Sequence, residues 1–153
     1  MDTIKAKTIL YVEDDPVVLT AYCHRLEREG FSVESAKDGL EAMKILLRLV
    51  PDLVVLDLML PKFDGAEVLK FIQANPRLKT VPVIILSTNS IVDADEEYVL
   101  EGAHRRFIKD HCTFPMMLQA IQKLLVEAPA KDNALADGQM DSGLPKKLEK
   151  TAA

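Results

Sequence analysis

The chain has 153 residues, of which 48% are hydrophobic and 28% charged, and its formal net charge is −5. This length fits one domain with a tail, and the negative charge argues against direct binding to nucleic acid or to an anionic membrane. Cys23 and Cys112 lie far apart, which argues against a disulfide framework or a zinc site and favours a reducing compartment. No stretch is apolar and long enough to be a secretory leader or a membrane span, so we expect a cytoplasmic protein.

The chain begins with a predicted strand and helix. Residues 8–12 are apolar and rich in β-formers, which predicts a buried strand. It ends abruptly in three acids, Glu13, Asp14 and Asp15. Asp15 is the predicted N-cap of a helix over 17–29, with Pro16 in its first turn. Gly30 is expected to end this helix as the C′ residue.

The next two elements are a half-exposed strand and an amphipathic helix. Residues 31–35 alternate between apolar and polar, which predicts a strand at a sheet edge. Asp38 is the expected cap of a helix through Leu49, and Pro51 marks its stop. The predicted apolar face of this helix consists of Leu40, Met43, Leu46 and Leu47.

The stretch from 51 to 65 carries the most informative pattern. Residues 53–56 are Leu-Val-Val-Leu, too short for an amphipathic helix, and they predict a fully buried central strand. Asp57 follows directly, which places a carboxylate at the carboxyl end of that strand, where open α/β sheets have their sites. Taken by itself, Asp57 is better interpreted as the end of a strand or the cap of a turn; the other polar strand ends reverse this preference. Asp64-Gly65 is expected to begin a helix through Ala74.

The second half repeats the alternation of strand and helix. Residues 81–86 form another apolar strand, followed by the polar Ser87. An acidic helix is predicted over 92–101, a short charged strand over 105–108 with Lys109 at its end, and an amphipathic helix over 114–126.

Five strands that alternate with five helices predict an α/β protein with a doubly wound, flavodoxin-like (βα)5 parallel sheet. The three continuous apolar strands belong in its centre, and the alternating second strand and charged fifth strand belong at its edges. This ranking predicts the strand order 2-1-3-4-5. Residues 127–153 lack an apolar pattern and are expected to be a disordered tail or the start of a linker.

In this order the polar strand ends converge on one rim. They are Glu13, Asp14, Asp57, Ser87 and Lys109. Three crowded carboxylates repel one another, and a hard divalent cation such as Mg²⁺ relieves that repulsion. A carboxylate beside Mg²⁺, an ammonium group and a hydroxyl is suited to accept a phosphoryl group, with Asp57 as the nucleophile that forms an acyl phosphate.

From about residue 7 to 126 the chain resembles the receiver domain of two-component response regulators. The matching features are Glu13-Asp14-Asp15 after the first strand, Asp57-Leu58-Met59-Leu60-Pro61 with Asp64-Gly65, the strand 82–86 with Ser87, and Gly102-Ala103 followed by Lys109.

The resemblance implies a partner, a set of ligands and a role. A sensor histidine kinase or a phosphotransfer protein would phosphorylate Asp57, and the domain would act as a phosphoacceptor in signal transduction rather than as an enzyme. The implied Mg²⁺ ligands are Asp14 and Asp57 directly, Glu13 through water, and the backbone carbonyl of Met59. Ser87 and Lys109 would contact the phosphoryl oxygens. A homodimer would use the face formed by 92–101, 105–108 and 114–126.

Two positions depart from the family. Arg106 stands where the family has a switching aromatic residue, and Phe107 is expected on the opposite face of the strand. We hypothesise that Arg106 swings instead and pairs with Glu96 or Glu97; the alternative is a solvated arginine. Asp110 stands where the family has proline, so we expect a trans peptide bond after Lys109.

The pattern has two alternative functional interpretations. A receiver-like module that binds partners without phosphate stays open because of Arg106 and Asp110. A phosphatase of the haloacid dehalogenase type is rejected, because such enzymes need a second aspartate two residues after the nucleophile, and that residue is Met59. The output of the chain is left open, because no DNA-binding or enzyme motif follows residue 126.

Overall fold

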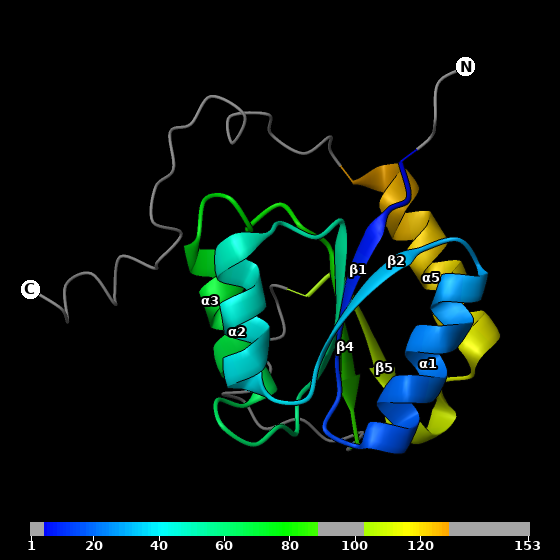
Figure 1. The fold of residues 1–153 in the computed structure, drawn as a ribbon, viewed down its shortest axis with the longest axis horizontal. Coiled ribbons are helices and arrows are strands. Elements are labelled where there is room, and N and C mark those ends of the chain that lie inside the picture. The colour runs from blue at the N-terminus through cyan, green and yellow to red at the C-terminus, as the bar shows by residue number, and fades with distance from the viewer. Residues whose placement is uncertain (1–4, 89–102, 129–153) are drawn as a thin grey trace, which may run out of the picture.

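A parallel sheet of five strands lies between two layers of helices in the computed structural model, which describes residues 5–88 and 103–128 (Figure 1). The strands are β1 (Thr8–Val12), β2 (Ser32–Ala36), β3 (Leu53–Asp57), β4 (Val83–Ser87) and β5 (Arg105–Ile108). The helices are α1 (Pro16–Arg28), α2 (Gly39–Arg48), α3 (Gly65–Ala74), α5 (Phe114–Glu127) and the 3₁₀ helix η1 (Lys109–His111). The sheet order β2-β1-β3-β4-β5 confirms the predicted doubly wound topology.

The two faces of the sheet carry separate hydrophobic cores. Helices α2 and α3 cover one face, and α1 and α5 cover the other (Figure 1). Strand β1 shows the division, because Leu10 and Val12 pack in the α2–α3 core while Ile9 and Tyr11 pack in the α1–α5 core. This is the two-residue period of a strand that is buried on both faces.

Strands β2 and β5 form the two edges of the sheet, as their alternating and charged residues predicted. Every residue of β3 and β4 is buried, whereas Ser32 and Ser35 of β2 and Arg105 and Arg106 of β5 are exposed. Arg106 aligns with Ile85, which belongs to the α2–α3 core. Phe107 is buried in the α1–α5 core, so the prediction that these neighbours lie on opposite faces is confirmed.

The predicted caps are confirmed. The side chain of Asp15 accepts hydrogen bonds from the amides of Val17 and Val18, at 2.9 and 3.3 Å. Asp38 and Asp64 cap α2 and α3 in the same way. These bonds satisfy backbone donors that have no partner inside a helix. Gly30 follows the end of α1 with a φ of 99°, a left-handed conformation that favours glycine.

The buried face of α2 differs from the prediction. The buried side chains are Ala42, Ile45 and Leu46, whereas Met43 and Leu47 are only partly buried. The buried residues, with Leu49 packed beside them, have the i, i+3, i+4, i+7 spacing of one helix face. The first turn of α2 is also bound to the loop after β3: Gly39 donates to the carbonyl of Pro61 at 3.3 Å, and Leu40 to that of Lys62 at 2.9 Å. These bonds are tertiary, so the apolar pattern alone could not reveal them.

The structure tests two further predictions, on the start of β4 and on the Lys109–Asp110 peptide bond. Strand β4 begins at Val83 rather than at residue 81, since Pro82 has no amide proton to donate to a neighbouring strand, although its carbonyl accepts from Val54. The Lys109–Asp110 peptide bond is trans, as expected. The predicted helix over 92–101 and the predicted tail lie outside the described residues, apart from Glu127 and Ala128.

Candidate functional site

The carboxyl ends of β1, β3, β4 and β5 bring together the residues that the sequence singled out. Val12, which precedes Glu13, pairs with Leu56, and Asp57 pairs with Leu86. Ser87 in turn pairs with Ile108, which precedes Lys109. The parallel register therefore gathers all these strand ends at one edge of the sheet.

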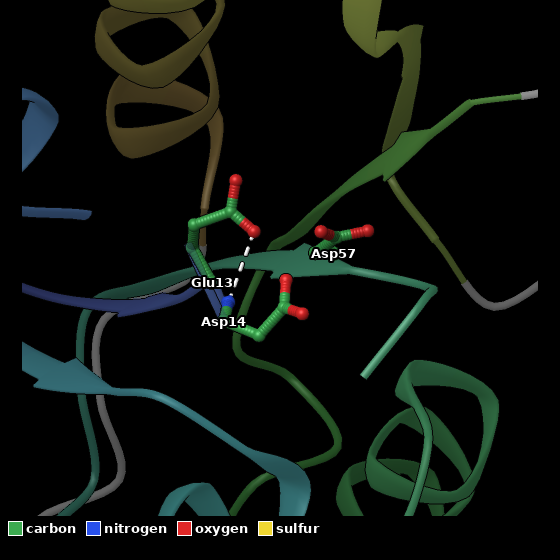
Figure 2. A group of neighbouring side chains, drawn as sticks. All are labelled: Glu13, Asp14 and Asp57. Atoms are coloured by element: carbon green, nitrogen blue, oxygen red, sulfur yellow. Dashed lines mark hydrogen bonds between the residues drawn. The ribbon is translucent and has the colours of Figure 1, made fainter. Parts of the chain in front are cut away.

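Glu13, Asp14 and Asp57 form a compact group of carboxylates (Figure 2). Each residue offers an oxygen, and these three oxygens lie within 4.8 Å of one another. Glu13 and Asp57 are buried, while Asp14 is exposed at the mouth of the group. The group thus has a desolvated base and a side that is open to solvent, as a site that exchanges a ligand requires.

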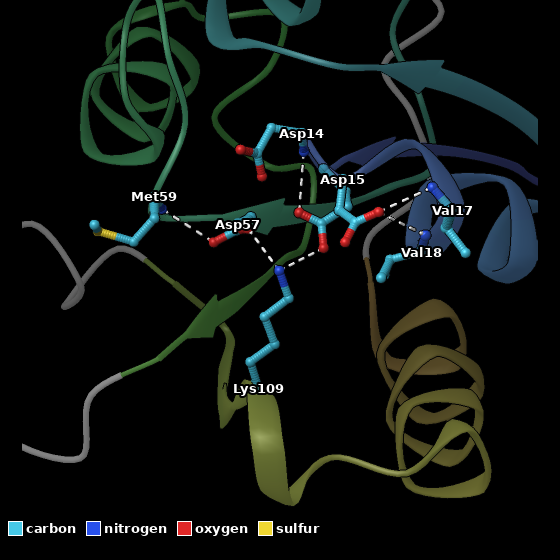
Figure 3. A network of polar contacts seen from close by, with 8 residues as sticks. Asp14, Asp15, Val17, Val18, Asp57, Met59 and Lys109 are labelled. Carbon is cyan, nitrogen blue, oxygen red and sulfur yellow. Dashed lines mark hydrogen bonds and ion pairs between the residues drawn. The ribbon is translucent and has the colours of Figure 1, made fainter.

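Lys109 is the counter-charge of this group (Figure 3). Its ammonium nitrogen lies 3.0 Å from Oδ2 of Asp57 and also forms an ion pair with Glu13. Such charge-assisted contacts are about twice as strong as neutral hydrogen bonds. Lys109 is therefore held directly over the carboxylate that is predicted to accept the phosphoryl group.

Backbone amides orient two of the carboxylates. The amide of Met59 donates to Oδ1 of Asp57 at 3.0 Å, and the amide of Asp14 donates to Oε2 of Glu13 at the same distance (Figure 3). Because Lys109 binds the other oxygen of Asp57, both oxygens of this side chain have a donor. The orientation of Asp57 is thus set before any ligand arrives.

Burial and charge shift the protonation of the group. Burial raises the pKa of Glu13 to about 7, a hydrogen bond with Asp57 adds to this, and Lys109 opposes it. Burial by itself would lower the pKa of Lys109, but its bonds to Glu13 and Asp57 outweigh that effect and raise it. Lys109 therefore stays charged at neutral pH, and Glu13 keeps its proton to a higher pH than an exposed glutamate does.

The loop after Asp57 leaves no room for a side chain at Gly65. A Cβ atom there would overlap the carbonyl oxygen of Asp57, and it would lie 2.5 Å from the Cα of Leu58. The amide of Gly65 also donates to the carbonyl of Leu58 at 3.0 Å. Helix α3 therefore begins in direct contact with the backbone of Asp57, and this explains the Asp64-Gly65 pair in physical terms.

Three predicted site residues, Ser87, Met59 and Arg106, lie outside the group of carboxylates and Lys109. Ser87 is buried as the last residue of β4, on the strand adjacent to Asp57. Met59 is exposed, and its carbonyl as a metal ligand stays a prediction. Arg106 is exposed on β5; its proposed partners, Glu96 and Glu97, lie outside the described residues.

The donor set of the site fits Mg²⁺. The three nearby side chains offer only carboxylate oxygens, which are the ligands that this hard cation prefers. Asp14 and Asp57 are the acids that would bind the ion directly, and a backbone carbonyl and waters would complete the shell. A divalent cation would also share with Lys109 the task of neutralising the buried acids.

The comparisons with known proteins agree with this geometry. The family model of the response regulator receiver domain matches residues 9–124. This chain belongs to the response regulator receiver family. The receiver domain is also 28% identical over 122 residues to the polar-differentiation response regulator DivK of Brucella anthropi, covering 80% of this chain and 98% of the relative.

Solved receiver structures show the same fold. The signal receiver domain of a histidine kinase from Syntrophus aciditrophicus is 29% identical and has a TM-score of 0.72 over 83% of this chain and 96% of its own. TrrA from Thermotoga maritima, solved with Mg²⁺ and BeF, is 29% identical with a TM-score of 0.68 over 77% and 98%. The receiver domain of a sensor histidine kinase from Pseudomonas aeruginosa holds a magnesium ion in its active site cleft; it is 27% identical, with a TM-score of 0.71, and the match covers 80% of this chain and 99% of that one.

In the part of this chain that the structure describes, no helix is both long and apolar enough to span a membrane.

Two features of the site were missed from the sequence. The first is the ion pair of Lys109 with Glu13, which joins residues at the ends of strands that are not neighbours in the sheet. The second is the amide of Met59 as a donor to Asp57. An aspartate whose side chain accepts from the amide two residues later is a recognised turn pattern, so the Asp57–Met59 spacing was the available signal for the second.

Proposed function

We propose that this receiver domain accepts a phosphoryl group on Asp57 in a Mg²⁺-dependent reaction. The donor would be a sensor histidine kinase or a phosphotransfer protein. The observation that carries the proposal is the position of Asp57, a buried carboxylate that is held by an amide, faces an ammonium group and lies beside two further acids. These contacts favour Asp57 as a phosphoacceptor over the alternative that it only ends a strand or caps a turn.

The chemistry needs no general base, because an ionised carboxylate is already a nucleophile. One oxygen of Asp57 would form the new bond to phosphorus. The bond from phosphorus to the imidazole nitrogen of the donor would break, and its electron pair would stay on that nitrogen. The amide of Met59 fixes the carboxylate during this step, and the direction of attack is thereby preset.

Charge stabilisation would come from the surrounding groups. Lys109 would turn from the Asp57 carboxylate to the oxygens of the transferred group, and the hydroxyl of Ser87 would donate to another of them. Bound Mg²⁺ would neutralise negative charge on the acids and on the phosphoryl oxygens. Asp14, Asp57 and the Met59 carbonyl would bind the ion directly, and Glu13 would contact it through a water molecule.

The output of this reaction would be a change of protein contacts. Ser87 and Arg106 are the proposed switch residues, because they lie on the adjoining strands β4 and β5, with Ser87 at the rim. We propose that the domain acts as a phosphoacceptor in the cytoplasm, assists its own phosphorylation and dephosphorylation, and catalyses no reaction on an outside substrate. Homodimerisation through the face of β5, α5 and residues 92–101 belongs to the same proposal.

The deciding experiment is the intact mass of the protein after incubation with acetyl phosphate and Mg²⁺. Wild type is expected to gain one phosphoryl group, and this gain should disappear with EDTA or in Asp57→Asn. Asp52→Asn is a matched control, because Asp52 lies at the opposite end of β3 and accepts from the amide of Thr8. If wild type gains nothing and also fails to bind beryllofluoride, the phosphate-independent interaction module becomes the better function.

A further inference from the structure

The loop between β3 and α3 is bound to the first turn of α2. The amide of Gly39 donates to the carbonyl of Pro61 at 3.3 Å, and the amide of Leu40 donates to the carbonyl of Lys62 at 2.9 Å. The first amides of a helix have no partner within it, so these two carbonyls complete the N-terminus of α2. The loop that leads the chain from Asp57 to α3 is therefore held by a helix that precedes β3.

Gly39 allows this close approach. A Cβ atom at Gly39 would overlap the carbonyl oxygen of Phe63, and it would lie 2.8 Å from the carbonyl oxygen of Lys62. The φ of Gly39 is not positive, so other residues could adopt its backbone conformation. The position needs glycine because backbone atoms of the loop occupy the space that a side chain would fill.

The loop has a strained backbone at this contact. Lys62 and Phe63 have φ values of 46° and 66°, in the left-handed region that residues other than glycine rarely adopt. Such strain persists only where surrounding contacts impose it. The carbonyl of Lys62 accepts from Leu40, and the carbonyl of Phe63 lies against Gly39. The contact with α2 thus lies at the strained residues and opposes their relaxation.

The residues that link Asp57 to this contact are anchored unequally. The amide of Leu58 donates to the carbonyl of Leu86 at 3.0 Å, and the carbonyl of Leu58 accepts from the first amide of α3 at the same distance. Leu58 and Leu60 are also buried in the α2–α3 core. Met59 lies between them and is exposed. A change in the path of the loop would therefore be taken up mainly at Met59.

Met59 is also the residue whose amide holds Asp57, at 3.0 Å from its Oδ1 (Figure 3). We propose that Gly39 is a positioning residue of the site. By admitting the loop carbonyls against α2, it keeps Met59 in the place from which its amide orients the Asp57 carboxylate. The consequence for phosphorylation rests on the proposed function, whereas the effect on the Met59 amide does not.

The test uses Gly39→Ala and follows the Met59 amide by NMR and by hydrogen exchange, on the full chain without Mg²⁺ or phosphodonor. The added methyl group forces the loop away from α2, so this amide is expected to shift its resonance and to exchange at least roughly tenfold faster than in wild type. Mg²⁺ affinity, measured by calorimetry, should fall about tenfold, as it does when a partner of a metal ligand is lost.

Ala42→Gly is the matched control. Ala42 is buried on the same helix, and this change lowers helix propensity and removes a methyl group without adding an atom near the loop. The variant should lose stability in urea, but its Met59 amide should keep the resonance and the exchange rate of wild type. A purely structural role of Gly39 would instead make the two variants alike at Met59.

A backbone substitution tests the hydrogen bond without the steric change. Replacing Leu40 with the corresponding α-hydroxy acid creates an ester that lacks only the N–H bound to the carbonyl of Lys62. This protein keeps Gly39, and it decides the question if Gly39→Ala does not fold. Its Met59 amide is expected to exchange roughly two- to tenfold faster than in wild type.

The proposal is overturned if folded Gly39→Ala keeps the wild-type exchange rate of the Met59 amide or, where that variant does not fold, if the ester keeps it. It is also overturned if Ala42→Gly speeds this exchange as much as Gly39→Ala does. A wild-type protein that takes no phosphoryl group from acetyl phosphate would contradict the proposed function alone, because the Met59 amide reports on Gly39 without phosphorylation.

Discussion

Lys109 and Asp57 are separated by 52 residues in the sequence, yet Nζ of Lys109 lies 3.0 Å from Oδ2 of Asp57. The contact exists because β4 pairs with both β3 and β5, which aligns the ends of these strands. Lys109 also pairs with Glu13, so one partly exposed ammonium group serves two buried carboxylates. The stability of the site without metal therefore depends on this side chain.

Replacing Lys109 with methionine should lower the free energy of unfolding of the metal-free protein by about 2–3 kcal/mol. Breaking a fully buried ion pair costs about 3–5 kcal/mol, and the partial exposure of Lys109 reduces that figure. The measurement is urea unfolding with EDTA above neutral pH, where Glu13 is ionised. Lys123→Met on the exposed face of α5 is the matched control, and equal losses in the two variants would contradict the proposed role of Lys109.

Mg²⁺ should stabilise the wild-type protein through the acidic group. At an ion concentration of ten times Kd, the free energy of unfolding is expected to rise by about 1.4 kcal/mol. Asp14→Asn should weaken Mg²⁺ binding by about tenfold or more. Replacing a residue that only hydrogen-bonds to a metal ligand already lowers metal affinity about tenfold, and Asp14 is expected to be a direct ligand.

Asp15→Asn is the control for this measurement. It removes the same charge from the neighbouring residue, but asparagine can still cap α1 toward Val17 and Val18. Its Mg²⁺ titration, followed by calorimetry, should match that of wild type. If both variants lose the ion equally, general negative charge rather than the Asp14 ligand would account for the binding.

Gly65→Ala should damage both stability and phosphorylation. A methyl group at Gly65 would push against the backbone of Asp57 and Leu58, with an expected loss of about 3 kcal/mol in urea unfolding. Gly30→Ala provides the comparison, because its Cβ would meet nothing within 4 Å and only the positive φ is unfavourable, at about 1 kcal/mol. Acetyl phosphate should label Gly30→Ala at the wild-type rate and Gly65→Ala more slowly; equal rates would show that α3 does not position Asp57.

His104 should make the stability of the protein depend on pH. Its Nδ1 accepts a hydrogen bond from the amide of Val83 at 3.1 Å, and burial lowers the pKa of the ring from 6.5. A histidine with a lowered pKa stabilises the fold above pH 6.5, and this contribution is lost as the pH falls below that value, because the unfolded chain then binds the proton more readily.

The matched variant is His104→Asn, whose side-chain oxygen can accept from Val83 without titrating. Between pH 7 and about 5, wild type should lose about 0.5–1 kcal/mol more stability than this variant, a modest figure because the ring is partly exposed. His24→Asn on the exposed surface of α1 should follow wild type. A variant His104→Asn that tracks wild type through this range would show that the ring does not contribute.

Arg106 is expected to act after phosphorylation rather than during it. Arg106→Ala should be labelled by acetyl phosphate like wild type, but it should lose part of the NMR shift changes that beryllofluoride produces in β4 and β5. Arg105→Ala is the control, because Arg105 lies on the same face as Phe107, 5.1 Å from its ring centroid. Unchanged shifts in Arg106→Ala would mean that this arginine is a solvated surface residue.

Much of the fold and site is encoded in short stretches of the chain. The apolar run before Asp57 identified the central strand, and the acids at 15, 38 and 64 identified three helix starts, because strand burial and helix capping depend on residues close in sequence. The different burial of the five strands was enough to predict their order. The polar strand ends then predicted Asp14, Asp57 and Lys109 as members of one site.

The tertiary structure decided what these residues contact. The backbone bonds from Gly39 to Pro61 and from Leu40 to Lys62 join the start of α2 to the loop after β3, and no local pattern predicts them. The sharing of Lys109 by Asp57 and Glu13 likewise arises only when separate elements pack together. Local sequence determines which groups reach the rim of the sheet, whereas distances and charge states there depend on packing across the whole domain.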